Sequence, residues 1–528
     1  MMKCVLLFCC FSVALSVSAQ VTYQDIKNPD PHNWLTYSGS YSSNRYSLLK
    51  QIDTGNVRSL IPAWIFHVKK EDLLECVPVV VNGVMYVTKA GTVYALDGGT
   101  GRLIWTYHHP FIHPGTPNRG VAVYANRVYF TTPDAFLVAL DRRTGNFLWR
   151  SKIAEAKEGY WSPAAPLALN GKIITGVAPG DDGMNGLIAA FDAATGKMLW
   201  CWNTIPKPGE PGHATWAGNS WKQGGGATWL SGSYDPELNL IFWGIGNPSP
   251  DYNGDARQGD NLYTECMVAL DADTGKLKWY FQFTPHDTAD WDAVEIPVLV
   301  NHAFDGRMLK LLVQADRNGF YYLLDRTNGK FLRGSPFVHS LNWASGLTQK
   351  GQPIRIPGVE SSVKGTKVCP SADGATNWMS PAYSPKTGYF YLEVLEGCQI
   401  QTKAAQAFRP GGFSYDGTGP ADVPGAPLQT YVRALDLITG KLEWEYKLIG
   451  ARDYGAGVLA TAGGLLFAGS PQGSFIAFNA KTGKVLWHFN AGQQISASPM
   501  TYGFKGEQYV AIAAGSDVIA FRLFDTRQ

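Results

Sequence analysis

Apolar and polar positions follow one another in a phrase of eleven residues that returns seven times along the chain. Its clearest copies run from Ala95 to Trp105 and from Ala269 to Trp279. Each begins with an apolar strand end, continues with an Asp that can accept hydrogen bonds from the backbone ahead of it, and reaches a Gly suited to positive φ. The next strand starts at Leu or Val and carries the Trp. Each phrase therefore predicts a β-hairpin.

The other copies keep the same kind of turn, and a Trp closes every copy except the fifth, which is degenerate. The turn residues are Asp97, Asp141, Asp192, Asp271, Asp325, Asp436 and Asn479, and the closing residues are Trp105, Trp149, Trp200, Trp279, Arg333, Trp444 and Trp487. A spacing of roughly 43 to 54 residues fits one four-stranded sheet per repeat, which is typical of propeller blades. Two longer gaps contain weaker hairpins at 234–239 and 383–388. We therefore predict an all-β, eight-bladed β-propeller in which the repeated tryptophans pack.

Repeats over nearly the whole chain favour one closed ring over several domains, although 528 residues would allow two or three. We expect a single propeller domain over 20–528. The charge is balanced, with 45 Lys and Arg against 43 Asp and Glu, so a nucleic-acid partner is not indicated.

The first 19 residues have the composition of a cleaved secretory signal. Lys3 precedes an apolar run from Cys4 to Val17, and Ala19 ends a small-residue motif before Gln20. The run is short for a transmembrane helix. We expect cleavage near Ala19, a periplasmic or secreted protein, and no integral membrane segment after the signal is removed.

An oxidising compartment permits disulfides. Cys369 and Cys398 flank the weak hairpin at 383–388 in one expected blade, so we predict that they are bonded. Cys76, Cys201 and Cys266 are expected to be small buried residues. The absence of a Cys-x-x-Cys-His motif predicts no covalent haem on this chain.

Three polar segments interrupt the repeat. Asn247 follows the apolar strand 240–243, Asn377 follows Cys369, and Asp287, Asp290 and Asp292 crowd three carboxylates into six residues. Such crowding costs repulsion unless a cation or solvent intervenes, and a hard metal prefers oxygen ligands of this kind. The sequence leaves two interpretations open: a metal site, or an acidic solvated loop with Asp287 as a turn cap.

These motifs together resemble the pyrroloquinoline quinone (PQQ) dependent alcohol dehydrogenases. The resemblance rests on the repeat phrase, on Gly-Asn247-Pro after a strand, on Thr-Pro-His-Asp287 leading into Asp290-Trp-Asp292, and on Asp-Arg317-Asn-Gly. It extends from about Trp34 to Leu523. It implies an eight-bladed propeller with PQQ and a metal ion in the axial funnel.

On the cofactor side, the resemblance assigns a role to five residues. Glu75 matches a glutamate that contacts the quinone, Arg119 and Arg317 match arginines that hold it, Trp229 matches the indole beneath the ring, and Asn377 matches an amide at its edge. Guanidinium groups suit the carboxylates of PQQ, and an indole offers a flat apolar floor.

On the metal side, the resemblance implies Asn247 as a ligand, Asp290 as the catalytic base, and Asp292 where one branch of the family adds a carboxylate for a lanthanide. Asp181 stands in place of the family's metal-binding glutamate. The implied ion is Ca²⁺ or a lanthanide, which would polarise the reactive carbonyl as a Lewis acid. The spacing of the family's ring-floor disulfide also agrees with Cys369 and Cys398.

The chain departs from the family pattern at four places. The adjacent-cysteine pair is replaced near His113-Pro114, the expected glutamate is Asp181, an expected arginine is Asn185, and Gly455 stands where many members have a Trp. These changes concern the site that would hold the cofactor and its metal ion, and they do not affect the predicted fold.

Two main functional hypotheses follow. In the first, a periplasmic quinoprotein oxidises a small alcohol with PQQ and a metal ion and passes electrons to a separate periplasmic acceptor such as a c-type cytochrome. In the second, a propeller of the same descent has lost PQQ and serves as a binding or assembly module. An outer-membrane assembly propeller would share the blade phrases but would not need the segment from Asp290 to Asp292.

Overall fold

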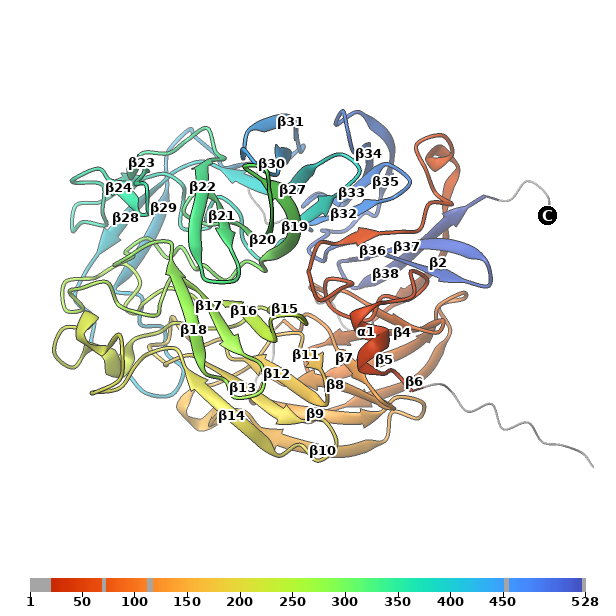
Figure 1. The fold of residues 1–528 in the computed structure, drawn as a ribbon, viewed down its shortest axis with the longest axis horizontal. Coiled ribbons are helices and arrows are strands. Elements are labelled where there is room, and N and C mark those ends of the chain that lie inside the picture. The colour runs from red at the N-terminus through yellow and green to blue at the C-terminus, as the bar shows by residue number, and fades with distance from the viewer. Residues whose placement is uncertain (1–19, 69–72, 112–116, 451–454, 525–528) are drawn as a thin grey trace, which may run out of the picture.

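Eight mainly antiparallel sheets surround one axis in a ring (Figure 1). The computed structural model describes residues 20–68, 73–111, 117–450 and 455–524. The expected signal segment 1–19 and His113-Pro114 lie outside these ranges. The eight sheets agree with the all-β propeller predicted from the sequence, and no helix in the described ranges has the length and apolar character needed to cross a membrane.

In seven sheets, the strands run in chain order from the axis outward. The first sheet contains β3 (Val79–Val81), β4 (Val84–Lys89), β5 (Thr92–Asp97) and β6 (Leu103–His108). The second contains β7 (Ala122–Tyr124), β8 (Arg127–Thr131), β9 (Phe136–Asp141) and β10 (Phe147–Lys152). The third contains β11 (Leu167–Leu169), β12 (Lys172–Gly176), β13 (Leu187–Asp192) and β14 (Met198–Asn203). Sheets four and five contain β15 (Ser233–Asp235), β16 (Leu240–Gly244), β17 (Cys266–Asp271) and β18 (Leu277–Gln282); and β19 (Val298–Phe304), β20 (Arg307–Ala315), β21 (Phe320–Asp325) and β22 (Lys330–Pro336). The sixth sheet contains β26 (Ala382–Ser384), β27 (Tyr389–Glu396), β30 (Gln429–Asp436) and β31 (Leu442–Lys447). The seventh contains β32 (Val458–Thr461), β33 (Leu465–Gly469), β34 (Ser474–Asn479) and β35 (Val485–Asn490), and β1 (Tyr46–Ser47) is added at its inner edge.

The eighth sheet joins the two ends of the chain. It contains β36 (Met500–Phe504), β37 (Glu507–Ala514) and β38 (Asp517–Leu523) from the C-terminal part and β2 (Leu60–His67) from the N-terminal part. β2 pairs with β38 antiparallel, from Leu60 opposite Leu523 to His67 opposite Asp517. This pairing closes the ring through backbone hydrogen bonds.

The repeat phrase forms the turn that its sequence predicts. In the copy at Asp271, the carboxylate Oδ1 accepts the backbone N–H of Thr274 at 3.0 Å, and the N–H of Gly275 donates to the Asp271 carbonyl at 2.8 Å. Gly275 has a φ of +68°. The third strand of the blade thus turns into the fourth through an Asx turn.

In five of the phrases the tryptophan docks on the turn of the next blade. The indole of Trp279 donates from Nε1 to the Arg326 carbonyl at 3.1 Å and lies against Gly329. Five other indoles donate to the following turn in the same way: Trp64, Trp105, Trp149, Trp200 and Trp444. Trp64, which belongs to the eighth sheet, is outside the seven sequence phrases. Arg333 of the degenerate copy donates instead to the Ile438 carbonyl at 3.4 Å.

Both weaker hairpins are present, as β15–β16 and β26–β27. The sixth blade also carries an insertion that contains β25 (Thr366–Val368), β28 (Gln399–Lys403) and β29 (Thr418–Asp422), and β23 (Ala344–Leu347) pairs with β24 (Pro353–Arg355) before it. The predicted disulfide between Cys369 and Cys398 is present and ties this insertion together. Cys76 and Cys266 are buried as expected, but Cys201 is exposed on β14, because this outermost strand presents alternate residues to solvent.

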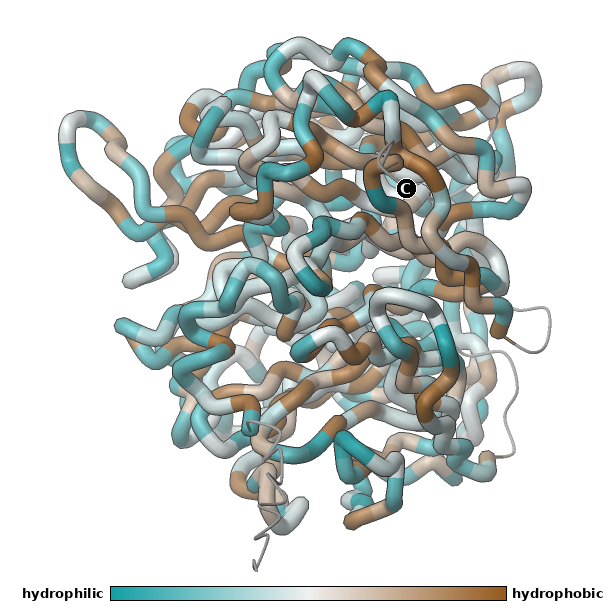
Figure 2. The backbone as a smooth tube through the Cα atoms, turned by 90° about the vertical axis from the view of Figure 1, so that its right-hand side faces the viewer, coloured by the Kyte–Doolittle hydropathy of each residue, from teal (hydrophilic) through white to brown (hydrophobic). Residues whose placement is uncertain are grey.

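Helical structure is short. The structure contains α1 (Tyr23–Lys27) and the 3₁₀ turns η1 (Val57–Ser59), η2 (Ala156–Glu158), η3 (His213–Thr215) and η4 (Ser220–Gln223). The hydrophobic stretches run through the blades and the hydrophilic ones cluster at loop tips, as Figure 2 shows. The core therefore lies between adjacent blades rather than in one central cluster.

The N-terminal segment crosses one end of the ring. The carbonyls of Tyr41, Ser42, Asn44 and Arg45 accept the backbone N–H groups of residues on the inner strands of four successive blades, namely Tyr234, Leu299, Tyr383 and Ala460. Only near the axis can five consecutive residues reach four blades. The guanidinium of Arg45 is fully buried there and donates to the carbonyls of Val458, Tyr37 and Pro499.

We predict that docking of the indole on glycine stabilises the ring. A Cβ at Gly329 would lie 2.5 Å from Trp279, whereas one at Gly306 would meet no atom within 4 Å, and both glycines have nearly equal positive φ (+75° and +76°). Gly329→Ala should lower the free energy of unfolding by about 1–3 kcal/mol more than Gly306→Ala, because it adds overpacking to the same backbone cost. Guanidinium denaturation measures both losses, and equal losses would contradict this role.

Candidate functional site

The site is built from connections at the end of the ring opposite the N-terminal segment. These connections precede an inner strand or join the second strand of a blade to the third, whereas the N-terminal segment bonds to residues within the inner strands themselves. One cavity of about 240 Å³ lies among them. Its lining residues are Arg119, Trp161, Pro163, Ala178, Asp181, Trp229, Asp290, Asp292, Arg317, Asn377 and Trp378.

The cavity collects most of the residues that the sequence predicted, from positions as distant as Arg119 and Asn377. Glu75 and Asn247 do not line it directly. Glu75 Oε2 lies 2.7 Å from Arg119 Nη2, and Asn247 bonds to Asp292 through its backbone N–H at 2.8 Å. Both therefore contact the wall of the cavity.

Asp292 joins the two sides of the site. Its Oδ2 accepts the indole N–H of Trp229 and the guanidinium of Arg317, each at 2.9 Å, and its Oδ1 accepts the N–H of Asn247. The guanidinium of Arg119 lies 4.7 Å over the ring of Trp229. A single carboxylate thus orients an indole, an arginine and the loop that carries Asn247.

Asn377 and Arg119 complete the polar wall. Asn377 is nearly buried, and its Nδ2 donates to the Asp373 carbonyl at 3.1 Å. Arg119 is also nearly buried, and its Nε has no hydrogen-bond partner among the described residues. A buried cationic donor of this kind fits an anionic ligand in the cavity.

Three carboxylates meet at one point of the site. One oxygen each of Asp181, Asp251 and Asp290 lies within 4.8 Å of the others. Asn247 Nδ2 donates to Asp251 Oδ1 at 2.8 Å, while Asn247 Oδ1 is buried without a hydrogen-bond partner among the described residues. Oxygen donors in this arrangement suit a hard cation.

Burial and mutual repulsion raise the pKa of all three carboxyl groups. Asp181 is exposed to solvent although protein atoms surround its carboxyl group closely, and this crowding together with the charge of Asp292 raises its pKa to about 7. Burial, with Asp181 as a neighbour, raises the pKa of Asp251 and Asp290 well above the usual range. A cation among them would oppose these shifts by favouring the ionised form.

Asp290 lies in a strained backbone conformation, with a φ of +62°. Its Oδ2 accepts the hydroxyl of Tyr252 at 3.1 Å. Burial raises the pKa of Tyr252 well above the usual range, so this phenol remains a donor. Asp287 is buried and accepts the N–H groups of Ala289 and Trp291, so it caps the turn that projects Asp290 but is not solvated.

A loop of the sixth blade bonds to the two loops that carry Asp181 and Asp251. In the connection from β28 to β29, Tyr415 donates its N–H to the Asp181 carbonyl at 2.6 Å, and the Asp416 carbonyl accepts the N–H of Tyr252 at 2.8 Å. This loop therefore links the backbone of the loop that carries Asp181 to that of the loop that carries Asp251.

Two departures from the family pattern have a structural explanation. Asn185 bonds to Gly224 and Trp221 and so fixes a neighbouring loop instead of lining the cavity. A side chain at Gly455 would meet the carboxylate of Glu393 at 1.4 Å, so Glu393 fills the space beside this backbone.

Sequence reasoning missed Asp251, Tyr252, Trp161 and Trp378 as site residues. The first two follow Asn247 within five positions. Asp251 could therefore have been predicted as a further oxygen donor in the same turn. The two tryptophans lie outside the repeat phrase but carry no other local mark.

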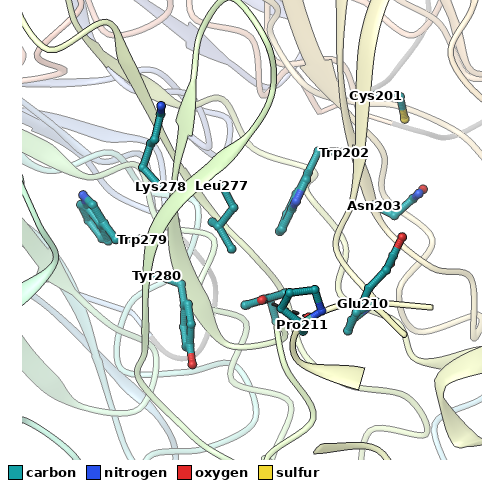
Figure 3. Close-up of a pocket in the computed structure, with 11 residues that line it drawn as sticks. Cys201, Trp202, Asn203, Glu210, Pro211, Leu277, Lys278, Trp279 and Tyr280 are labelled. Carbon is teal, nitrogen blue, oxygen red and sulfur yellow. Dashed lines mark hydrogen bonds between the residues drawn. The ribbon is translucent and has the colours of Figure 1, made fainter. Parts of the chain in front are cut away.

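A larger cavity of about 670 Å³ lies elsewhere, on the outer wall between β14 and β18 (Figure 3). Trp202, Tyr280 and Leu277 face into it, and Glu210 and Lys278 are among the other lining residues. It contains none of the residues predicted for the site.

The sequence matches the profile of the family described as PQQ: Glucose/ethanol/alcohol dehydrogenase, beta-propeller domain, over residues 34–334 and 449–510. The chain belongs to this family. It is 40% identical to the quinoprotein alcohol dehydrogenase PedH of Pseudomonas putida, over 95% of this chain and 88% of that protein.

Solved structures give the same assignment. A quinohemoprotein alcohol dehydrogenase, ADHIIG of Pseudomonas putida HK5, superposes with a TM-score of 0.90 at 33% identity, covering 96% of this chain and 83% of its own. A europium-containing methanol dehydrogenase gives a TM-score of 0.86 at 30% identity, covering 95% and 100%. The relatives are oxidoreductases, which favours the enzyme hypothesis over the empty scaffold.

Proposed function

We propose that this protein is a PQQ- and metal-dependent alcohol dehydrogenase whose centre is the axial cavity. The observation that carries the proposal is the meeting of Asp181, Asp251 and Asp290 beside Asn247, at the cavity that also holds Arg119, Arg317 and Trp229. Membership of the family supplies the chemistry that this set of donors fits.

The residues divide into two groups by chemistry. Arg119, Arg317, Asn377 and Trp229, with Glu75 behind Arg119, would hold PQQ through guanidinium–carboxylate contacts and a flat indole. The buried and unpartnered Asn247 Oδ1 fits a cation, either Ca²⁺ or a lanthanide, which the carboxylates would also bind. The chemistry that PQQ supplies when bound is two-electron oxidation of an alcohol carbon.

Asp290 holds the position of the general base. A cation held beside it would keep its carboxylate ionised, and Tyr252 fixes one of its oxygens by donating a hydrogen bond. The carboxylate then accepts the proton of the alcohol hydroxyl as the carbon is oxidised. The turn capped by Asp287 and the left-handed backbone at Asp290 hold the carboxylate toward the cavity.

The proposal extends to the setting of the enzyme. An exported mature chain beginning near Gln20, folded as one propeller unit, would oxidise a small alcohol in the periplasm. The electrons would pass to a separate acceptor such as a c-type cytochrome.

Reconstitution tests the function. Purified protein is mixed with PQQ and either Ca²⁺ or La³⁺, and we expect quinone absorbance to appear in the protein fraction together with reduction of a dye by a primary alcohol. A protein that binds no PQQ and reduces no dye with either ion would support the empty-scaffold hypothesis instead.

Asp290→Asn should separate binding from chemistry. The substitution keeps the shape of the side chain but removes the group that accepts the proton, and loss of a general base typically lowers the rate by about 10² to 10⁴. Dye-linked turnover measures this fall, with quinone absorbance retained. An unchanged rate would exclude Asp290 as the base.

Tyr252→Phe should lower kcat while leaving KM for the alcohol nearly unchanged, because Tyr252 positions Asp290 without contacting substrate. A hydrogen bond to a charged group contributes roughly 1.5–3 kcal/mol, so we expect a fall of about tenfold or more. Tyr263→Phe is the matched control, since it loses a hydroxyl bonded to the Pro211 carbonyl beside the outer cavity. Equal rates for the two variants would contradict the positioning role.

A further inference from the structure

Asp251 lies in the turn that begins at Asn247, on the connection from β16 to β17. One of its oxygens lies within 4.8 Å of one oxygen each of Asp181 and Asp290, which lie on two other connections of the ring. Only 2% of Asp251 is exposed. Ring closure therefore places three carboxylates at one point where repulsion opposes their approach.

The side chain of Asn247 points independently to a cation. Its Nδ2 donates to Asp251 Oδ1, and because a carboxylate only accepts hydrogen bonds, this contact fixes which end of the amide faces Asp251. The other end, Oδ1, is fully buried and has no hydrogen-bond partner among the described residues. A carbonyl oxygen in that state is a suitable ligand for a hard metal ion.

The neighbouring guanidinium groups bond to other acceptors. Arg257 donates to the carbonyls of Pro250, Asp251 and Asp287 and to the Asn261 side chain. Arg317 donates to Asp292 and to the Ala372 carbonyl. Arg257 thus braces the backbone and Arg317 braces Asp292, while the charge of Arg317 also favours the ionised forms of Asp181 and Asp290.

We propose that Asp251 binds the metal ion directly, as an additional ligand of this chain, and that it compensates for the shorter side chain of Asp181. The inference rests on the proposed function for the presence of a metal in the cavity. The Asp251 side chain would contact the ion while its Oδ1 keeps the Asn247 amide turned toward the same ion.

The proposal has a consequence for the choice of ion. Asp181, Asp251 and Asp290 contribute three negative charges, and Asn247 contributes a neutral oxygen. A trivalent lanthanide ion balances these three charges, whereas Ca²⁺ leaves one of them uncompensated. Because Coulomb attraction scales with the charge of the ion, loss of one carboxylate weakens trivalent binding more than divalent binding.

Metal binding itself provides the test, without turnover. Full-length purified protein without PQQ is titrated with Tb³⁺, and ion luminescence is excited through the cavity tryptophans; Ca²⁺ affinity follows from competition. Asp251→Asn keeps an oxygen that can accept from Asn247 Nδ2 but removes the charge. Asp260→Asn is the matched control, because Asp260 is an exposed aspartate of the same connection.

We expect Asp251→Asn to weaken Tb³⁺ binding at least tenfold and Ca²⁺ binding by a smaller factor, while Asp260→Asn matches the wild type. Asp251→Glu keeps the charge and should retain the preference for Tb³⁺. Without metal, the melting temperature of Asp251→Asn should be close to that of the wild type, because the amide oxygen still accepts the hydrogen bond from Asn247.

Three outcomes would overturn the inference. Unchanged Tb³⁺ affinity in Asp251→Asn would show that Asp251 is no ligand, while PQQ binding and turnover by the wild type would leave the proposed function intact. Equal weakening for both ions would show a structural role only. A wild type that binds neither ion nor PQQ would overturn the proposed function and this inference together.

Discussion

The pairing of β2 with β38 is the constraint on which the site depends. These strands come from opposite ends of the chain, and their backbone hydrogen bonds hold the first and last blades in one ring. No blade contains enough of the cavity to bind a ligand alone, because Arg119, Trp229 and Asn377 belong to loops of different blades. The indoles docked on neighbouring turns then fix the angle between blades, so closure at one sheet sets the positions of loops across the ring.

Ring closure also explains how carboxylates that repel one another are held close together. The central carboxylates cannot move apart, since each is carried on a loop anchored in a different blade. Asp292 satisfies its charge with Arg317 and Trp229, whereas Asp181, Asp251 and Asp290 face one another. The packing between blades therefore holds the three carboxylates close together although their mutual repulsion is unfavourable, as is usual for functional sites.

The sequence predicted most of the fold because the repeat phrase is local. An Asx turn such as that at Asp271 needs only nearby residues, so its pattern is visible without the structure. Trp64 was missed because the outer strand of the eighth blade comes from the other end of the chain, without the phrase that precedes it elsewhere. Cys201 was taken as buried because local sequence gives no position for a residue on an outermost strand.

For the site, the predicted residues Asp181, Asp290 and Asp292 do converge, but their partners differ in ways that local sequence does not encode. Asp292 bonds to Trp229, 63 positions away. Asp251 approaches Asp181 and Asp290 because of how three loops meet at the axis. The space beside Gly455 is filled by Glu393. This contact depends on how two blades pack together, so neither local sequence predicts it.

The N-terminal segment lies across the axis of the propeller. Residues 41–45 bond to the inner strands of four blades at one end, and the carboxylates lie at the other. In the proposed enzyme, the connections that line the cavity would therefore form the surface that substrate and product pass.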